Sequence, residues 1–341
     1  MTRLTPLTPG RATAVFAILI GALPVSLVLA VMVGAVPISP LDVLAALGGG
    51  GDPVTGVIIR ELRGPRVLAA ALVGGSLGAA GALLQGLFRN PLADPYVTGT
   101  SAGAALGAVG VIALGGTLSA AVVPLAAFVG ALVSALVVWQ LARLGGRTTV
   151  LTVLLAGVVL TSFAGSLVTL LLVSSDRLAL RLRAIIDILS GGVAIRAPGE
   201  LAVAAAVVAL GLGLALALGR QIDAFVFGEE TAATLGVDPE RTTVAVIGAS
   251  ALLTGAAVAL AGLVGFVGLV VPHALRPFVG ATHRRLVLAC FLGGASALVL
   301  ADLGARIVLA PAEVPVGVIT GLVGAPFFLF LLVRAGRRAT L

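Results

Sequence analysis

Arginine dominates the side chains that could take part in chemistry. The 341 residues include 21 basic side chains, all of them arginine, with 14 carboxylates, two histidines and one cysteine, Cys290. Without lysine the chain cannot form a P-loop of the G-x-x-x-x-G-K-[ST] type, so it cannot hydrolyse ATP by that route. The carboxylates are scattered, and His273 and His283 stand alone, so no catalytic set is found. No catalytic and no metal-ligating residues are predicted.

Recognition of carboxylates is the chemistry that the arginines can supply. Arg63, Arg66 and Arg306 are expected near one external surface, where exposed guanidinium groups could receive the carboxylates of a partner protein. Asp302 lies four residues before Arg306, so the two are expected to pair on one helix face.

These side chains must be positioned by membrane-spanning helices. Hydrophobic residues make up 60% of the chain and charged residues only 10%, whereas a soluble domain has about 25% charged residues. Because a span needs about 20 apolar residues, we predict an all-α polytopic protein with about ten transmembrane helices, forming a single domain over residues 1–341. The span at 263–280 contains Pro272 and is expected to be broken or partly re-entrant. The predicted spans are 14–36, 66–87, 97–115, 119–142, 149–173, 199–219, 242–262, 263–280, 286–309 and 315–334.

The distribution of arginines predicts the orientation of the chain. An even number of spans places both termini on one side, and that side carries more arginines than the other. The positive-inside rule therefore predicts cytoplasmic termini, and the net charge of +7 indicates cytoplasmic arginine rather than a nucleic-acid partner. Residues 37–65 are then an external segment, expected to be a long polar connection.

Residues 228–241 interrupt the apolar pattern on the cytoplasmic side. Glu229 to Leu235 can form about two turns of helix, and Gly236 can supply the left-handed residue that ends them. Asp238 can cap the next helix, with Pro239 at its first position. Such a unit could dock into another protein, although by itself it could equally be a solvated loop.

A second polar interruption follows the second predicted span. Asn90-Pro91-Leu92-Ala93-Asp94-Pro95 contains two prolines, which force an extended segment. Non-helical backbone near membrane depth survives only where protein or water covers it. The segment is therefore expected either beside a water-filled path or in an ordinary tight loop.

Several motifs, in the same order along the chain, resemble a known family of permeases. LRGPRVL from Leu62, QGLFRNPLADPYVTGTSAGA from Gln85 and the Leu-Gly pair at Leu235 match its signatures. So do ALAGLVGFVGLVVPHALR from Ala259 and ADLGARIVLAPAEVPVGVITGLVG from Ala301. The chain resembles the FecCD-like membrane permeases of ABC importers for iron–siderophore complexes, cobalamin or haem.

The resemblance implies a transport complex in the bacterial cytoplasmic (inner) membrane. Two permease subunits, most simply a homodimer, would surround a central path, with two ATP-binding cassette subunits below them. ATP and magnesium would be held by those subunits, and this chain would hold no cofactor. A periplasmic or lipid-anchored substrate-binding protein would dock outside, and no nucleic acid would be bound.

The same resemblance assigns roles to individual residues. Arg63, Arg66 and Arg306 would receive acidic residues of the binding protein. The cytoplasmic gate and path would include Asn90, Leu92, Thr148 and Thr149. Coupling to the ATPase would fall to the segment 228–241, through Glu229, Glu230, Ala232, Ala233, Leu235, Gly236 and Val237.

The function that follows is ATP-driven import of a bulky metal chelate, foremost an iron–siderophore, by alternating access. The alternative is a secondary transporter driven by an ion gradient. That alternative requires ionisable groups inside the membrane, and few are found mid-span. A third class, an intramembrane enzyme, would require a catalytic pair, and none is found.

Overall fold

The computed structural model describes residues 9–34, 36–96, 99–114, 122–143, 150–174, 186, 188–193, 195, 199–280 and 282–339. Its regular elements within these ranges are all helical. Seven helices are long and apolar enough to cross a membrane, and three shorter apolar helices accompany them. This confirms the predicted all-α polytopic architecture of about ten helices. The seven long helices are α1 (Pro9–Met32), α4 (Gly64–Leu87), α6 (Val122–Arg143), α7 (Val150–Ser174), α10 (Glu200–Ala217), α13 (Pro239–Ala261) and α15 (His283–Ile307). Helix α16 (Val316–Ala339) contributes one of the three shorter apolar stretches, Val316–Phe330.

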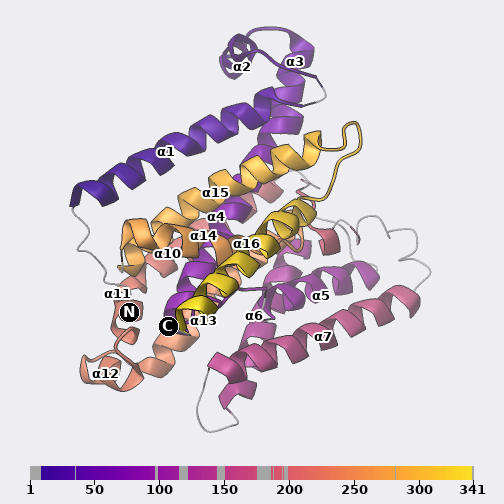
Figure 1. Ribbon diagram of the computed structural model, residues 1–341. Helices are drawn as coiled ribbons and strands as arrows, with labels where there is room; N and C mark the ends of the chain where they lie inside the picture. The colour runs from indigo at the N-terminus through magenta and orange to yellow at the C-terminus, as the bar shows by residue number, and fades with distance from the viewer. Residues whose placement is uncertain are drawn as a thin grey trace.

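Shorter helices complete the chain at the ends and within the bundle. They are α2 (Pro40–Leu47), α3 (Pro53–Val57), the π-helical segment η1 (Ile58–Arg63), α5 (Thr100–Ala113), α11 (Gly219–Phe225), α12 (Glu229–Thr234) and α14 (Val267–Val279). In Figure 1, α1, α15 and α16 slant in the same direction, with α2 and α3 beyond one end of the bundle and α12 beyond the other. Elements that are far apart in sequence thus occupy two opposite ends of the molecule.

The centre of the bundle is the crossing of α4 and α15. A side-chain carbon at Gly74 would collide with the carbonyl of Gly294, and one at Gly78 would collide with the carbonyl of Cys290. Glycine at these positions lets the two backbones meet, as is usual where helices pack inside lipid. The span containing α4 is 83% buried, whereas α1 is only 11% buried. Helix α4 is therefore central, and α1 lies at the edge of the bundle.

Helix α14 begins after a break, as predicted for residues 263–280. Phe266 precedes it with a φ of 68°, a left-handed conformation that non-glycine residues rarely adopt. Pro272 lacks the N–H that would normally bind the carbonyl of Gly268. The Nε2 of buried Gln85 lies 3.3 Å from the Gly268 carbonyl oxygen and donates to it. A side chain from α4 thus supports the short helix from outside.

The expectation of a long polar connection at residues 37–65 is wrong. Ser39 accepts a hydrogen bond from the backbone of Asp42 and caps α2, while Asp52 caps α3 through the backbone of Thr55. Each cap is followed by a proline at the first helical position, which favours helix initiation. The chain then runs through η1 directly into α4, so this segment is a helical cap.

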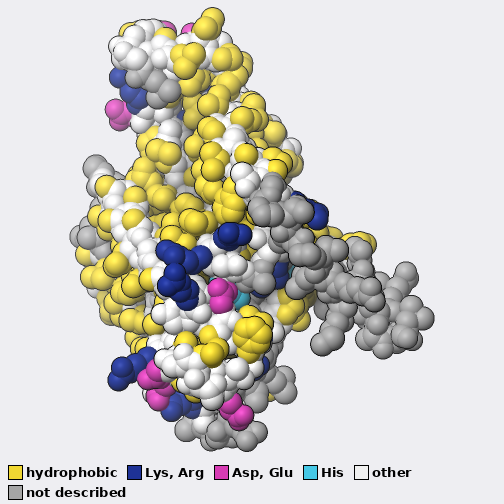
Figure 2. Space-filling view, turned by 90° about the vertical axis from the view of Figure 1, so that its left-hand side faces the viewer, with side chains coloured by type: hydrophobic (Ala, Val, Ile, Leu, Met, Phe, Trp, Pro, Cys, Tyr) yellow, Lys and Arg dark blue, Asp and Glu magenta, His cyan; other side chains and the backbone are white. Residues whose placement is uncertain are grey.

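The surface is apolar between two ends that carry charge. Figure 2 shows hydrophobic side chains over much of the face, while charged side chains gather mainly toward the end of α12, with a few at the opposite end. Such a band is expected of a surface that faces hydrocarbon.

Candidate transport sites at the two ends of the bundle

The end of α4 and α15 beside α2 and α3 carries a network of arginines and carboxylates. This end is predicted to face outward and is called the outer end. Asp302, 1% exposed, lies 3.0 Å from Nη2 of Arg66 and 3.2 Å from Nε of Arg306. Arg66 also donates to the Oε2 of Glu313 at 2.7 Å, and Glu313 is 53% exposed. The predicted Asp302–Arg306 pair is therefore confirmed, and Arg66 joins a buried carboxylate to an exposed one.

The remaining donors of this network hold the end of α1. Nη1 of Arg63 donates to the carbonyl of Val31 at 2.8 Å, and Nη2 of Arg306 donates to that of Ala30 at 2.8 Å. The last carbonyls of a helix have no partner within it, and arginine is a suitable donor for them. Guanidinium groups from η1 and α15 thus attach the peripheral helix α1 to the centre of the bundle.

The three arginines predicted to receive a partner's carboxylates do come together, but they differ in exposure. The side chain of Arg306 is only 7% exposed, and that of Arg66 is 24% exposed. The expectation that Arg306 is exposed is therefore wrong, because Asp302 and the end of α1 enclose it. Glu313 was missed by the sequence reasoning, although it lies seven residues after Arg306 in the motif from Ala301.

At the opposite end, which is predicted to be cytoplasmic and is called the inner end, α12 and the start of α13 form the predicted capped unit. Gly236 has a φ of +81°, and the backbone N–H of Val237 donates to the carbonyl of Ala232 at 3.0 Å. This is the hydrogen bond of a Schellman motif, which closes the end of a helix. Asp238 then accepts hydrogen bonds from the backbone of Glu240 and Arg241, as its predicted capping role requires.

The surface of this inner unit is apolar as well as charged. Leu235 is 64% exposed, and Phe227, just before α12, is 72% exposed. Ala232 is fully buried and Val237 packs against the core, so these two attach the unit to its own bundle. Exposed apolar side chains rimmed by polar ones are typical of a protein–protein interface. The other predicted coupling residues, Glu229, Glu230, Ala233 and Gly236, are exposed.

A carboxylate–histidine pair joins the inner unit to the central helices. Asp223, on α11, accepts a hydrogen bond from the backbone N–H of His283 at 2.8 Å and lies 2.6 Å from its Nδ1. His283 begins α15 and is 1% exposed. Ile222 precedes Asp223 on α11 and packs closely against Gly86 of α4. A side-chain carbon at Gly86 would collide with it. Helix α11, which leads into α12, is thus attached to both α4 and α15.

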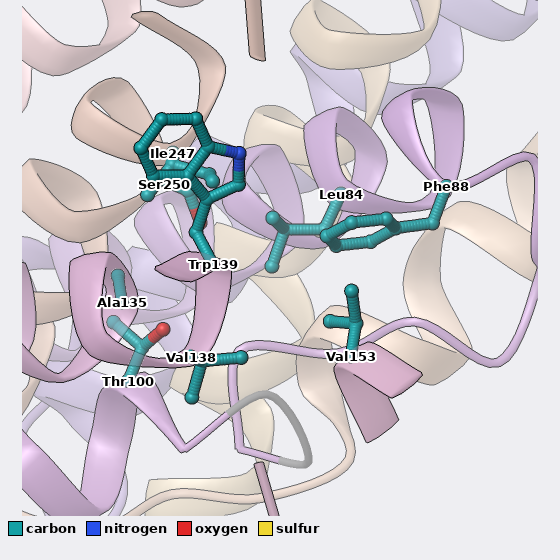
Figure 3. Close-up of a pocket in the computed structure, with 9 residues that line it drawn as sticks. All are labelled: Leu84, Phe88, Thr100, Ala135, Val138, Trp139, Val153, Ile247 and Ser250. Atoms are coloured by element: carbon teal, nitrogen blue, oxygen red, sulfur yellow. The ribbon is translucent and has the colours of Figure 1, made fainter. Parts of the chain in front are cut away.

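Two of the predicted gate residues, Asn90 and Leu92, lie on the segment that follows α4. Oδ1 of Asn90 accepts a hydrogen bond from the backbone of Leu92 at 3.0 Å, which stabilises a turn, and Leu92 is 37% exposed. Thr148 and Thr149 lie outside the described residues. Phe88, just before the turn, lines a small cavity of about 20 Å³, room for about one water molecule. In Figure 3 the rings of Phe88 and Trp139 lie on either side of Leu84.

A larger cavity of about 330 Å³ lies beside the break before α14. Asp94 and Tyr96, from the proline-rich segment, line it together with Phe266 and the start of α16 at Gly317. The segment thus lies beside a cavity, and its place beside a transport path stays a prediction. The lining residues beyond that segment were missed, because nothing in their local sequence shows that they converge.

The comparisons with known proteins agree with this arrangement. Residues 22–334 match the FecCD transport family. The chain is 42% identical to the cobalamin import system permease protein BtuC of Halobacterium salinarum, over 81% of this chain and 73% of that protein. It is 41% identical to the hemin transport system permease protein HmuU of Yersinia pestis, over 80% of this chain and 82% of that protein.

A solved structure agrees over nearly the whole fold. It is an inward-facing conformation of a protein assigned as a metal-chelate type ABC transporter, with a TM-score of 0.82 and 30% identity, covering 94% of this chain and 99% of that one. Together with the matching helices and motifs, these likenesses confirm the resemblance seen in the sequence. The chain therefore belongs to the FecCD transport family, as a membrane-spanning permease subunit of an ABC transporter.

Proposed function

We propose that this permease passes a bulky metal chelate from an external binding protein to the cytoplasm by alternating access. The observation that carries the proposal is the division of its polar features between opposite ends of α4 and α15. An arginine–carboxylate network lies at one end, and an exposed capped unit lies at the other. Signals from outside and inside would then meet on the same two central helices.

At the outer end, the binding protein docks by pairing its own carboxylates with Arg66 and Arg63. Arg306 acts through Asp302 and the end of α1, since its guanidinium is enclosed. At the inner end, α12 seats in an ATP-binding cassette subunit through Leu235 and the exposed residues around it. That subunit binds ATP and magnesium, and two of them serve two permease subunits, most simply two copies of this chain.

When the ATPase subunits close, α12 moves with them and α11 carries the movement to α4 and α15. The contacts between α11 and these helices, through Asp223 and Ile222, support this route. The cavity at Asp94 and Phe266 is the proposed section of the path, with Asn90 and Leu92 at its cytoplasmic gate. The protein lies in the bacterial inner membrane with α12 and both termini on the cytoplasmic side.

The proposed cargo is an iron–siderophore, with cobalamin and haem as the alternatives suggested by the relatives named for them. The test is uptake of each of these three compounds into proteoliposomes that contain the chain and its co-expressed ATPase. We expect uptake of one of them, dependent on ATP and on a loaded binding protein. Uptake by this chain alone, driven by an ion gradient, would refute the proposal and favour a secondary transporter.

A further inference from the structure

A groove on the outer edge of the bundle has no role in the proposed transport cycle. It encloses about 360 Å³ between α1, α2, η1 and α4, and its walls include Val28, Val31, Val43, Ile59 and Leu68. The volume lies within the range of about 300–1,000 Å³ that is usual for small-ligand sites. Arg60 is the one charged side chain among its lining residues.

The groove exists because α1 packs mainly on α15 and is attached there by arginines. The hydrogen bonds from Arg63 and Arg306 hold the last turn of α1. Val28, one turn earlier, remains 44% exposed, and Leu68 on α4 is 49% exposed. Apolar walls on both sides of a groove that opens at the lipid-facing edge call for an apolar occupant.

The neighbouring cap indicates the depth of the groove. Leu41 and Leu44 of α2 are 76% and 67% exposed, and Val54 and Val57 of α3 are also exposed. Short helices with exposed apolar side chains lie in the boundary between headgroups and acyl chains. The groove therefore opens at the outer boundary of the bilayer, where a phospholipid has its headgroup above and its chains below.

Arg60 supplies the charge that would recognise such a headgroup. Its Nε donates to the carbonyl of Gly56 at 3.3 Å, which orients the guanidinium. Its terminal nitrogens have no hydrogen-bond partner among the residues that the structure describes, and the side chain is exposed at the edge of the groove. A guanidinium with free donors suits a phosphate group.

We propose that this groove binds one anionic phospholipid of the outer leaflet, with an acyl chain between α1 and α4 and the phosphate on Arg60. The lipid would fill the space that the packing of α1 leaves open and so stabilise the peripheral helix. The choice of the outer leaflet rests on the orientation proposed above, but the groove does not depend on which cargo is carried.

Native mass spectrometry of the purified full chain in detergent tests the proposal. Phosphatidylglycerol and phosphatidylcholine are titrated as probes, and the lipids retained per chain are counted. We expect one phosphatidylglycerol per chain to be retained in preference to phosphatidylcholine. Val28→Trp, which fills the groove, should weaken its retention about tenfold. Arg60→Gln should reduce the preference for the anionic lipid about fivefold.

Two matched variants control for general effects. Val158→Trp places the same side chain at a 55% exposed position of α7, and Arg241→Gln removes an 89% exposed arginine at the opposite end. Both should leave the amount of retained phosphatidylglycerol unchanged. Every variant should also elute from size-exclusion chromatography at the same volume as the unchanged chain. Equal retention in Val28→Trp and Val158→Trp would overturn the groove assignment. An unchanged preference in Arg60→Gln would overturn the phosphate contact. Loss of dimers in Val28→Trp without loss of lipid would show that a second copy of the chain fills the groove.

Discussion

The two ends of the α4–α15 pair differ in whether their functional side chains already have partners within the chain. At the outer end, the arginines are already bonded within the chain, to Asp302, to Glu313 and to the end of α1. At the inner end, α12 exposes Leu235 and its two acidic residues, and only Ala232 is fully buried. The network of Arg63, Arg66 and Arg306 is thus bonded within its own chain, whereas the described residues at the inner end leave apolar surface exposed.

If the binding protein docks at the outer end and the ATPase at the inner end, as proposed, this difference predicts two kinds of docking. An outer partner must compete with bonds that already exist, so its attachment can be weak and reversible. An inner partner covers apolar surface that is otherwise exposed, so its attachment can be permanent. A permease that exchanges binding proteins but keeps its ATPase requires both kinds.

The largest expected effect is the loss of stability when the buried part of the outer network is disrupted, compared with the loss when its exposed part is disrupted. Asp302→Ala leaves Arg306 enclosed without its carboxylate, so the free energy of unfolding should fall by about 3–5 kcal/mol. Glu313→Ala removes an exposed partner of Arg66 and should lower it by about 1 kcal/mol or less. Denaturant unfolding in detergent measures both. Equal losses would contradict the view that the network has a buried centre.

At the inner end, the conformation of Gly236 can be tested without steric conflict. Nothing lies within 4 Å of a Cβ built there, so Gly236→Val acts mainly through the left-handed backbone, at about 1–2 kcal/mol. The transport complex should still hydrolyse ATP but import several-fold less cargo per ATP. Gly248→Val, also without a close neighbour but of ordinary conformation, is the control. Normal uptake in Gly236→Val would contradict the coupling role of this segment.

A smaller effect compares two carboxylates that accept backbone N–H groups at the starts of helices at opposite ends. Asp223→Ala removes the acceptor for the backbone N–H of His283 at the start of α15, whereas Asp52→Ala removes the cap of α3. Each should lower the free energy of unfolding by about 1 kcal/mol. Only Asp223→Ala should also reduce cargo imported per ATP, and Asp223→Asn, which keeps the acceptor oxygen, should restore it. Equal transport defects in both alanine variants would contradict a route through α11.

The smallest effect concerns competition for Arg66. Glu313→Gln weakens its bond to Arg66, so a carboxylate of the binding protein should meet less competition there. We expect binding of that protein to strengthen a few-fold, by less than about 1 kcal/mol. Surface plasmon resonance measures the change, with Glu61→Gln as an exposed control on η1. Weaker binding in Glu313→Gln would instead mean that Glu313 contacts the partner directly.

Much of the fold could be predicted because its signals are local. Apolar runs predicted the spans, and Gly236 and Asp238 predicted the turn and cap between α12 and α13, because these residues act on their own backbone. The helices at residues 37–65 could have been predicted from Ser39-Pro40 and Asp52-Pro53. Their polar composition concealed these cap signals.

What the sequence could not provide is the set of contacts between distant elements. Whether Arg306 is exposed or enclosed depends on where α1 ends. The residues next to Arg306 in the sequence do not indicate the position of that helix end. Likewise, Gln85 supports α14 across 183 residues, and the cavity at Asp94 is formed by four separate segments. The motif order revealed the family, but only the packing shows which arginines remain accessible.

The central claim is that the outer end receives the binding protein and the inner end receives the ATPase, each independently of the other. ATPase activity in proteoliposomes, with and without loaded binding protein outside, tests it in two variants. Arg66→Glu is expected to abolish stimulation by the binding protein but to keep basal ATPase activity. Gly236→Val is expected to bind the binding protein but not to respond to it. Full stimulation in Arg66→Glu, or failure of both variants to attach the binding protein, would contradict this division between the two ends.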